Sequence, residues 1–200
     1  NVKANGQLRI YSKWPFVGET IYSESKKKGN GTFACMVEIK GDTVVLINNH
    51  LESNSITEKE KDDYSEALGF HDKDKVKASG RVLLSRLSLA ATKRAEQTDS
   101  LCSLIQKYER YDMIVCGDMN DTPISYTYQQ IANLLKNAYE ESGTGLGISF
   151  NRKEFPVRID HIFTSKGLKS ARTFVNSKIS SSDHRPIITN IYKNTETKQA

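Results

Sequence analysis

Four short segments place acids, amides or imidazoles where apolar runs end. The clearest is residues 114–123, IVCGDMNDTP, in which a strand-like run leads into Asp118 and Asn120. Alternation along a strand puts these two side chains on one face, so an acid and an amide leave the core together. Such a carboxylate can hold a hard cation or a water, and the amide can orient either. Taken alone, Gly-Asp after a strand is more often a simple turn.

The segment TVVLINNH ends on an amide and an imidazole. It reads as the second strand of a hairpin that begins with TFACMVEIK and turns at Gly41. Alternation places Asn48 and His50 on one face, beyond the apolar positions that bury the strand. A lone histidine in this setting is usually structural. Its pairing with Asn48 favours a functional role.

The last two segments contain acids and histidines. In VRIDHIF, Asp160 interrupts an otherwise apolar row, and a buried carboxyl group needs a donor such as a nearby histidine. Asp183 and His184 directly precede the final strand, which begins at Pro186, where no ladder donor is needed. Four such clusters at strand ends together favour a single site.

Composition is that of one folded domain. A chain of 200 residues with 37% hydrophobic residues can bury a core. The net charge of +5 leans only weakly toward a phosphate-bearing partner, because 24 acidic residues are interspersed with the 29 basic ones. No apolar run reaches membrane-spanning length. Cys35, Cys102 and Cys116 stand far apart in apolar settings, which favours buried free thiols over disulfides or a zinc site.

The elements that must position the four segments alternate between strands and helices. Strands are expected around QLRIYSK and TIYS, and helices over residues 57–68, about 76–108 and about 125–135. KKKGNG and SGTGLG are expected to be loops. On the long helix, Arg94 and Gln97 lie three residues apart, within reach of loop carbonyls or phosphate, although an exposed helix face is the stronger interpretation. A helix between two strands covers one face of their sheet.

In this order, NNHLES, CGDMNDTP, RIDHIF and SSDHRPI resemble the motifs of the endonuclease/exonuclease/phosphatase superfamily of deoxyribonuclease I, exonuclease III and the sphingomyelinases. Each motif alone is modest, but the four in order make the resemblance strong over residues 7–193. The resemblance implies an α/β (α+β) fold, a four-layer α/β/β/α sandwich of two mixed β-sheets. It also implies one domain over residues 1–193, a polar tail at 194–200, and a site at the strand ends on one edge.

The resemblance also implies hydrolysis of a phosphoester by in-line attack of an activated water, with Mg²⁺ or Mn²⁺ as cofactor. Asp118 would activate the water and Asn120 would orient Asp118, while His184 would stabilise charge on the phosphoryl group. The implied catalytic residues are Asp118, Asn120, His184, Asp160 and His50; the implied substrate-binding residues are Asn48, Asn120 and His50; the implied metal ligands are Asp183 and Asp118.

The beginning of the chain departs from the superfamily pattern. Superfamily domains begin with a strand that ends in Asn and later contain a Gln-Glu pair whose Glu is the principal metal ligand. Nothing in residues 1–7 resembles either feature, and Glu19 and Glu24 stand in the wrong context. We therefore expect a C-terminal two-thirds of the domain, with its N-terminal strands absent, that binds cation weakly and has little activity alone. Exposed sheet edges in such a fragment favour self-association.

Three functions remain in view at this stage. A metal-dependent phosphodiesterase or nuclease is favoured. A phosphomonoesterase or lipid-headgroup phosphodiesterase uses the same machinery, and a non-catalytic binding module would make the polar clusters structural. The run Asp121-Thr122-Pro123 argues against the inositol polyphosphate phosphatases and resembles a broad bacterial group. A phosphoester partner is expected, a nucleic acid is left open, and no membrane contact is expected from this segment. The compartment and any upstream anchor are left undetermined.

Overall fold

A six-stranded mixed sheet forms the centre of the molecule, in the order β3-β4-β5-β6-β10-β7. The computed structural model describes residues 1–24, 29–54, 56–69, 73–152, 155–179 and 181–195. β5 and β6 are parallel, and the other neighbouring strands are antiparallel. The strands are β3 (Phe16–Glu24), β4 (Gly31–Ile39), β5 (Asp42–His50), β6 (Asp112–Asp118), β7 (Lys136–Asn137) and β10 (Asp160–Thr164).

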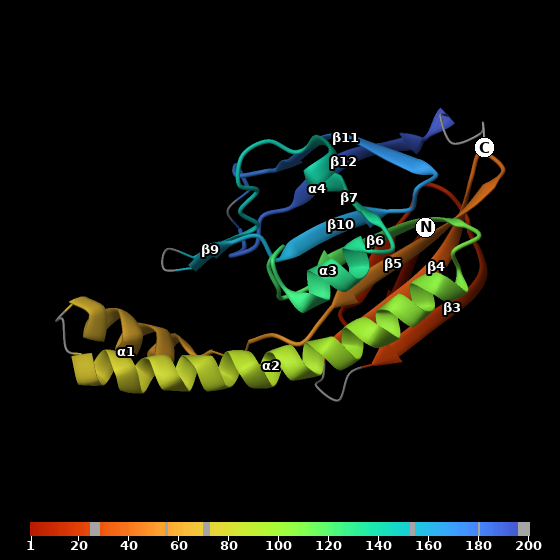
Figure 1. The fold of residues 1–200 in the computed structure, drawn as a ribbon. Coiled ribbons are helices and arrows are strands. Elements are labelled where there is room, and N and C mark those ends of the chain that lie inside the picture. Colours follow the sequence, from red (N-terminus) through yellow and green to blue (C-terminus); the bar gives the residue numbers. More distant parts are fainter. Residues whose placement is uncertain (25–28, 55, 70–72, 153–154, 180, 196–200) are drawn as a thin grey trace.

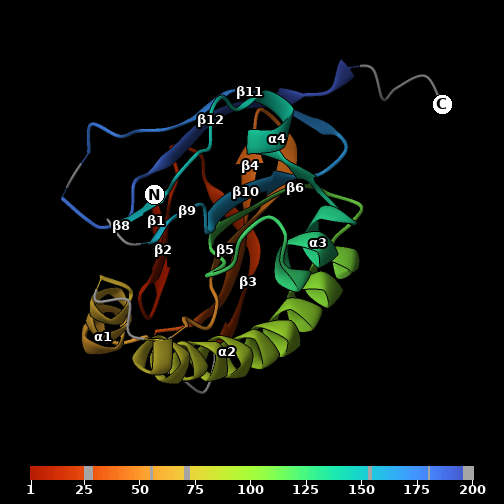
Figure 2. The same cartoon turned by 60° about the vertical axis from the view of Figure 1, so that its left-hand side comes forward.

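Helices cover one face of this sheet (Figures 1 and 2). They are the second half of α2 (Lys73–Lys107) and α3 (Tyr126–Ala132), and α1 (Glu58–Gly69) precedes α2 in the chain. The main core lies between this layer and the sheet, where Leu101 of α2 and Ile131 of α3 belong to one buried cluster with Val115 of β6. α1 and the first half of α2 extend beyond the sheet as an arm (Figure 1). The helices expected over residues 57–68 and 76–108 are confirmed.

Two antiparallel hairpins lie on the other side of the sheet from α2 (Figure 2). They are β1 (Val2–Asn5) with β2 (Leu8–Tyr11), and β11 (Leu168–Val175) with β12 (Ile187–Lys193). A third hairpin joins β8 (Phe150–Arg152) to β9 (Phe155–Val157), and a short helix α4 occupies Ala138–Ser142. The sheets and helices together confirm the predicted mixed α/β sandwich.

The strand expected around QLRIYSK corresponds to β2. The sequence analysis missed β1, β7, the β8–β9 hairpin and α4. Each is too short to show a clear hydrophobic period, so pattern alone does not separate it from a loop. Residues 26–28 of the predicted KKKGNG loop and residues 196–200 of the predicted tail lie outside the described residues. Within the described residues, no helix combines the length and the apolar character needed to cross a membrane.

Gly117 permits the close approach of β6 to β5 at the end of their parallel pair. It pairs with Asn49 and has a φ of 132°, a backbone conformation that L side chains rarely adopt. A Cβ added there would lie 2.0 Å from the carbonyl oxygen of Asn49. Because that neighbour is backbone, it cannot move aside without separating the strands.

We predict that Gly117→Ala destabilises the protein far more than Gly41→Ala. Gly41 also has a positive φ, of 89°, but an added Cβ there meets nothing within 4 Å. Both substitutions carry the conformational cost of about 1–3 kcal/mol, and only Gly117→Ala adds a backbone overlap. Urea unfolding of both variants measures the difference. Equal losses of unfolding free energy would show that the β5–β6 approach is not constrained at this position.

Candidate active site

Three neighbouring strands place acids and an imidazole in one row. His50 of β5 pairs with Asp118 of β6, and Asp118 pairs with Asp160 of β10. Paired residues of neighbouring strands point to the same face of a sheet, so these three side chains gather at one edge. This face is the one opposite α2, since Asn48, two residues before His50, donates from its side-chain amide to the carbonyl oxygen of Arg9 in β2, at 3.1 Å.

Asn120 holds the carboxylate of Asp118 from two sides. Its backbone N–H donates to Oδ1 of Asp118 at 2.8 Å, and its side-chain Nδ2 lies 3.2 Å from Oδ2. Nδ2 also donates to the carbonyl oxygen of Leu51, at 3.0 Å. The turn requires a φ of 51° at Asn120, which asparagine tolerates better than most residues. The Asp-x-Asn spacing therefore produces a carboxylate whose direction is set by its own loop.

His184 comes to the row from the segment before β12. Its Nδ1 lies 2.8 Å from Oδ2 of Asp160, and its Nε2 lies 3.9 Å from Oδ2 of Asp118. A carboxylate accepts the Nδ1 proton and so leaves Nε2 facing the site. The hydrogen bond that His184 donates to Asp160 is the main reason that the pKa of His184 is raised above its ordinary value. The imidazolium form therefore persists to higher pH than in a free histidine.

His50 is oriented by backbone. Its Nδ1 lies 3.2 Å from the carbonyl oxygen of Gly29, and its Nε2 lies 3.7 Å from Oδ2 of Asp118. A carbonyl oxygen can only accept, so Nδ1 is the protonated nitrogen of the neutral ring. Two imidazole Nε2 atoms thus face the same carboxylate from different strands. The pair can share or donate protons around Asp118.

The surroundings of Asp118 raise the cost of ionising its carboxyl group. Burial raises the pKa of Asp118 to about 6, and the nearby carboxylate of Asp160 adds to the shift, opposed by the Asn120 N–H and the two histidines. Ligand atoms of Asp118, Asp160 and His184 lie within 4.8 Å of one another. Two carboxylates and an imidazole at this spacing can hold a divalent cation, or can accept a proton near neutral pH.

Two predicted site residues lie apart from this cluster. Oδ2 of Asp183 is 3.2 Å from Nη2 of Arg152 in β8, so its carboxylate forms an ion pair and is not among the three clustered ligands. The side-chain nitrogen of Asn48 is used by Arg9. The structure therefore brings together Asp118, Asn120, Asp160, His184 and His50, and turns Asn48 and Asp183 toward other partners.

His161 is a buried polar residue beside the site that the sequence reading passed over. It is 2% exposed, and its Nε2 lies 3.0 Å from the carbonyl oxygen of Asp121 in the loop after β6. Its ring contacts the ring of Tyr128 edge-on and that of Phe163 at a tilt. Burial lowers the pKa of His161 to about 4. The sequence did contain a sign of this burial, because His161 alternates with the apolar residues Ile159 and Phe163 in VRIDHIF.

Arg94 and Gln97 contradict the interpretation of an exposed helix face. Arg94 is only 3% exposed, and both side chains contact the loop after β5. The less favoured interpretation was that these side chains reach loop carbonyls. It is correct for Arg94, which donates to the carbonyl oxygen of Glu52 at 3.0 Å. A single charged position in a helical pattern does not reveal a buried partner contributed by a distant loop.

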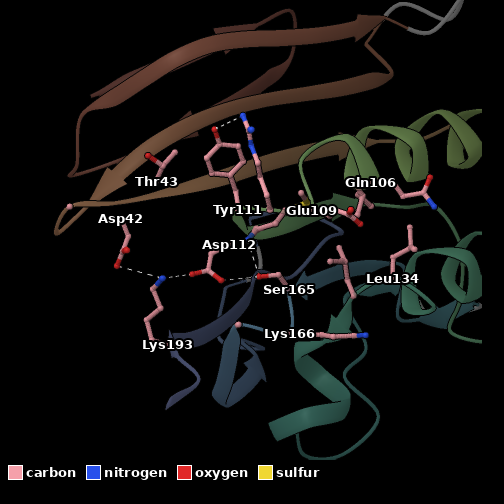
Figure 3. A pocket seen from close by; sticks show the side chains of 16 residues that line it. Asp42, Thr43, Gln106, Glu109, Tyr111, Asp112, Leu134, Ser165, Lys166 and Lys193 are labelled. Atoms are coloured by element: carbon pink, nitrogen blue, oxygen red, sulfur yellow. Dashed lines mark hydrogen bonds and ion pairs between the residues drawn. The ribbon is translucent and has the colours of Figure 1, made fainter. Parts of the chain in front are cut away.

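A pocket of about 830 Å³ lies at the opposite end of the central strands, beside the first residues of β5 and β6 (Figure 3). Figure 3 shows Lys193 between Asp42 and Asp112, and Ser165 also hydrogen-bonds Asp112. None of the predicted site residues lines this pocket. Its charged groups neutralise one another and tie β12 to the start of β6, so we assign it no part in the chemistry.

The family model described as the endonuclease/exonuclease/phosphatase family matches residues 4–184. The chain belongs to this family. The match includes every predicted site residue, and the site edge of the sheet corresponds to the motifs that suggested the family. Comparison with curated protein sequences gave no match.

Solved structures show the same fold. An endonuclease/exonuclease/phosphatase from Beutenbergia cavernae has a TM-score of 0.64 at 16% identity, with 91% of this chain and 46% of that chain covered. The human Nocturnin catalytic domain with bound sulfate has a TM-score of 0.56 at 18% identity, covering 90% and 60%. A mannosyl-6-phosphatase from Bacteroides thetaiotaomicron has a TM-score of 0.53 at 17% identity, covering 81% and 56%. The chain thus spans about half the length of these family structures.

We predict that His161 makes the fold acid-sensitive. Its pKa is about 4 in the folded protein and near 6.5 when unfolded, so only the unfolded state gains this proton between those values. The stability contribution is complete above about pH 6.5 and is lost as the pH falls toward 4, by about 3 kcal/mol. Urea unfolding at several pH values, compared with His161→Gln, isolates the effect because other acids titrate in both proteins. An identical pH slope in the two proteins would contradict it.

We predict that Asp160→Asn lowers the pKa of His184 toward its ordinary value. The hydrogen bond that His184 donates to Asp160 is the largest cause of the raised pKa, and a neutral amide cannot replace the carboxylate charge. The chemical shifts of the His184 ring, followed by NMR across a pH titration in both proteins, measure the change. An unchanged titration curve would mean that the two side chains are not paired in solution.

Proposed function

We propose that the chain forms the catalytic site of a divalent-metal-dependent phosphoesterase, a phosphodiesterase or nuclease that works by in-line attack of an activated water. The supporting observation is the convergence of Asp118, His184 and His50, with both Nε2 atoms within 3.9 Å of one carboxylate oxygen. Phosphoryl transfer needs positioning and positive charge against developing negative oxygens, and it needs little covalent chemistry from the protein. Family membership is consistent with this chemistry.

The residues present fit a hard divalent cation. Ligand atoms of Asp118, Asp160 and His184 lie within 4.8 Å of one another, and burial together with the nearby Asp160 carboxylate raises the pKa of Asp118, so a cation there would offset the cost of ionising that carboxyl group. Asp118 and Asp160 would hold the cation, which would supply positive charge to the phosphoryl oxygens. Asp183 would join them only if its ion pair with Arg152 opened.

Each residue then has a defined proton or charge to manage. Asp118, with a pKa of about 6, accepts the proton of the attacking water while Asn120 keeps the carboxylate in place. His184, held by Asp160, donates from Nε2 to the phosphoryl oxygens as charge develops there. His50, in its imidazolium form, would donate the Nε2 proton to the leaving oxygen and so become the neutral ring with its proton on Nδ1. We assign the phosphate contact to His50 rather than to Asn48, whose side-chain nitrogen is bonded to Arg9.

The substrate class is the finer part of the proposal. The neighbours of this fold include a Nocturnin domain with a bound sulfate, an anion shaped like phosphate, and a mannosyl-6-phosphatase. These names span more than one type of phosphoester. No lining residue of the described site distinguishes a monoester from a diester, so the favoured diesterase is to be decided by a substrate panel.

The proposal is tested on the full-length natural protein. Hydrolysis of a phosphodiester, a phosphomonoester, single-stranded DNA, RNA and sphingomyelin is measured with Mg²⁺ or Mn²⁺ and with EDTA. We expect metal-dependent cleavage of diesters, abolished by EDTA. Asp118→Asn and His184→Asn should each lower kcat by about 100- to 1,000-fold, the loss seen when one stabilising group is removed from a developing oxyanion.

Asp42→Asn is the matched control, because it removes a carboxylate at the opposite end of the central strands without touching the site. It should leave kcat and KM unchanged. Cleavage of monoesters alone, or of sphingomyelin alone, would replace the diesterase or nuclease with one of the related esterases. Activity that persists in Asp118→Asn and His184→Asn, or the absence of all hydrolysis in the wild type, would favour a non-catalytic binding module.

A further inference from the structure

Arg94 is a buried cation with two sets of partners. Its Nε donates to Oδ2 of Asp121 at 3.1 Å, while its Nη1 donates to the carbonyl oxygen of Glu52 at 3.0 Å and to Oδ1 of Asn54 at 2.7 Å. The side chain is 3% exposed, and charged side chains are almost never buried so fully unless they are paired. One guanidinium group therefore holds two separate loops from the side of α2.

The two loops directly follow the two strands that carry site residues. Residues 51–54 follow His50, and residues 119–122 follow Asp118. The loops also contact each other, since Nδ2 of Asn120 donates to the carbonyl oxygen of Leu51 at 3.0 Å. On the next turn of α2, Oε1 of Gln97 accepts the backbone N–H of Glu52 at 2.8 Å. The relative position of the two strand ends is thus set from the helix layer as well as by strand pairing.

We propose that Arg94 is a positioning residue, which fixes the spacing of His50 and Asp118 by holding the loops that follow them against α2. This inference rests on the proposed phosphoester hydrolysis for its effect on rate. The planar guanidinium group presents donors in a rigid fork and so can bond both loops at once. A lysine would keep the charge but would concentrate it on one atom, which cannot reproduce both sets of contacts.

Stability alone is a weak explanation for this arrangement. Replacing a buried ion pair by neutral groups of similar volume is often neutral or even stabilising, because desolvation of the charges offsets their attraction. Arg94 also does not touch the reacting groups, since its partners are Asp121, Glu52 and Asn54. What it provides is a fixed geometry between two loops, and a misplacement of about 1 Å in an active site can cost about 100-fold in rate.

The first test compares Arg94→Lys with Arg86→Lys in the full-length natural protein. Arg86 lies on the same helix, is 48% exposed and pairs with Glu60, so the same substitution there changes the same atoms at the surface. With both variants shown to be folded by circular dichroism, Arg94→Lys should lower kcat by about 10- to 100-fold and change KM by less than about twofold. Arg86→Lys should change neither. An unchanged kcat in folded Arg94→Lys would overturn the proposal.

The second test reads position without using activity. Hydrogen exchange is measured at the amides of Leu51 and Asn120, which bond Asp118, and at those of Ile47 and Val115 in the strand interiors. Arg94→Lys should speed exchange at Leu51 and Asn120 by about tenfold or more and leave the two interior amides unchanged, because local openings can occur independently of global unfolding. Uniform acceleration, or none, would show a merely structural role and overturn the proposal.

If Arg94→Lys does not fold, a double variant with no charge at either position shows whether the buried charge or the positioning of the loops matters. Arg94→Met combined with Asp121→Asn removes both charges and should fold, yet show the same low kcat and the same fast exchange at Leu51. Full activity of this double variant would overturn the proposal. Selective loosening of the two loops together with a wild type that hydrolyses no phosphoester would support the positioning role and refute the proposed function, so the two failures are distinguishable.

Discussion

The register of three strands is the constraint on which the site depends. β5 and β6 are parallel, β6 and β10 are antiparallel, and His50, Asp118 and Asp160 occupy one continuous row of that pairing. A slip of one residue in either pair would turn a whole set of side chains to the opposite face. Gly117 allows the close approach that this register needs. The fold thus determines which groups meet before any side chain interaction is counted.

Placing the carboxylates of Asp118 and Asp160 side by side costs free energy, and the groups that donate hydrogen bonds to them offset that cost. Burial of Asp118 and, second to it, repulsion from the carboxylate of Asp160 raise the pKa of Asp118. Asn120 donates to one carboxylate, and His184 pairs with the other. Perturbed titration of this kind concentrates at functional sites, because groups tuned toward neutral pH can exchange protons with substrate. A divalent cation, alone or bound together with a phosphate, would neutralise the remaining negative charge of the two carboxylates.

Local sequence pattern predicted that Asp118 and Asn120 share one face and that a buried charge needs a partner. Asp118 and Asn120 do lie together, but β6 ends at Asp118 and they meet through a turn rather than through strand alternation. The need of Asp160 for a histidine is met by His184, 24 residues away. Side-chain direction at the site rim could not be predicted. Asp183 turns to Arg152, and Arg94 is buried by two loops, because in both cases the partner comes from a segment whose position only the tertiary fold defines.

The most direct test of the account is a crystal structure of the full-length natural protein grown with Mn²⁺ and phosphate, with the metal located by its anomalous scattering. The account predicts a metal peak at the carboxylate of Asp118 and a phosphate within hydrogen-bond distance of Nε2 of both His184 and His50. A metal or phosphate bound only at the pocket beside Lys193, or His184 and His50 turned away from a common anion, would contradict it.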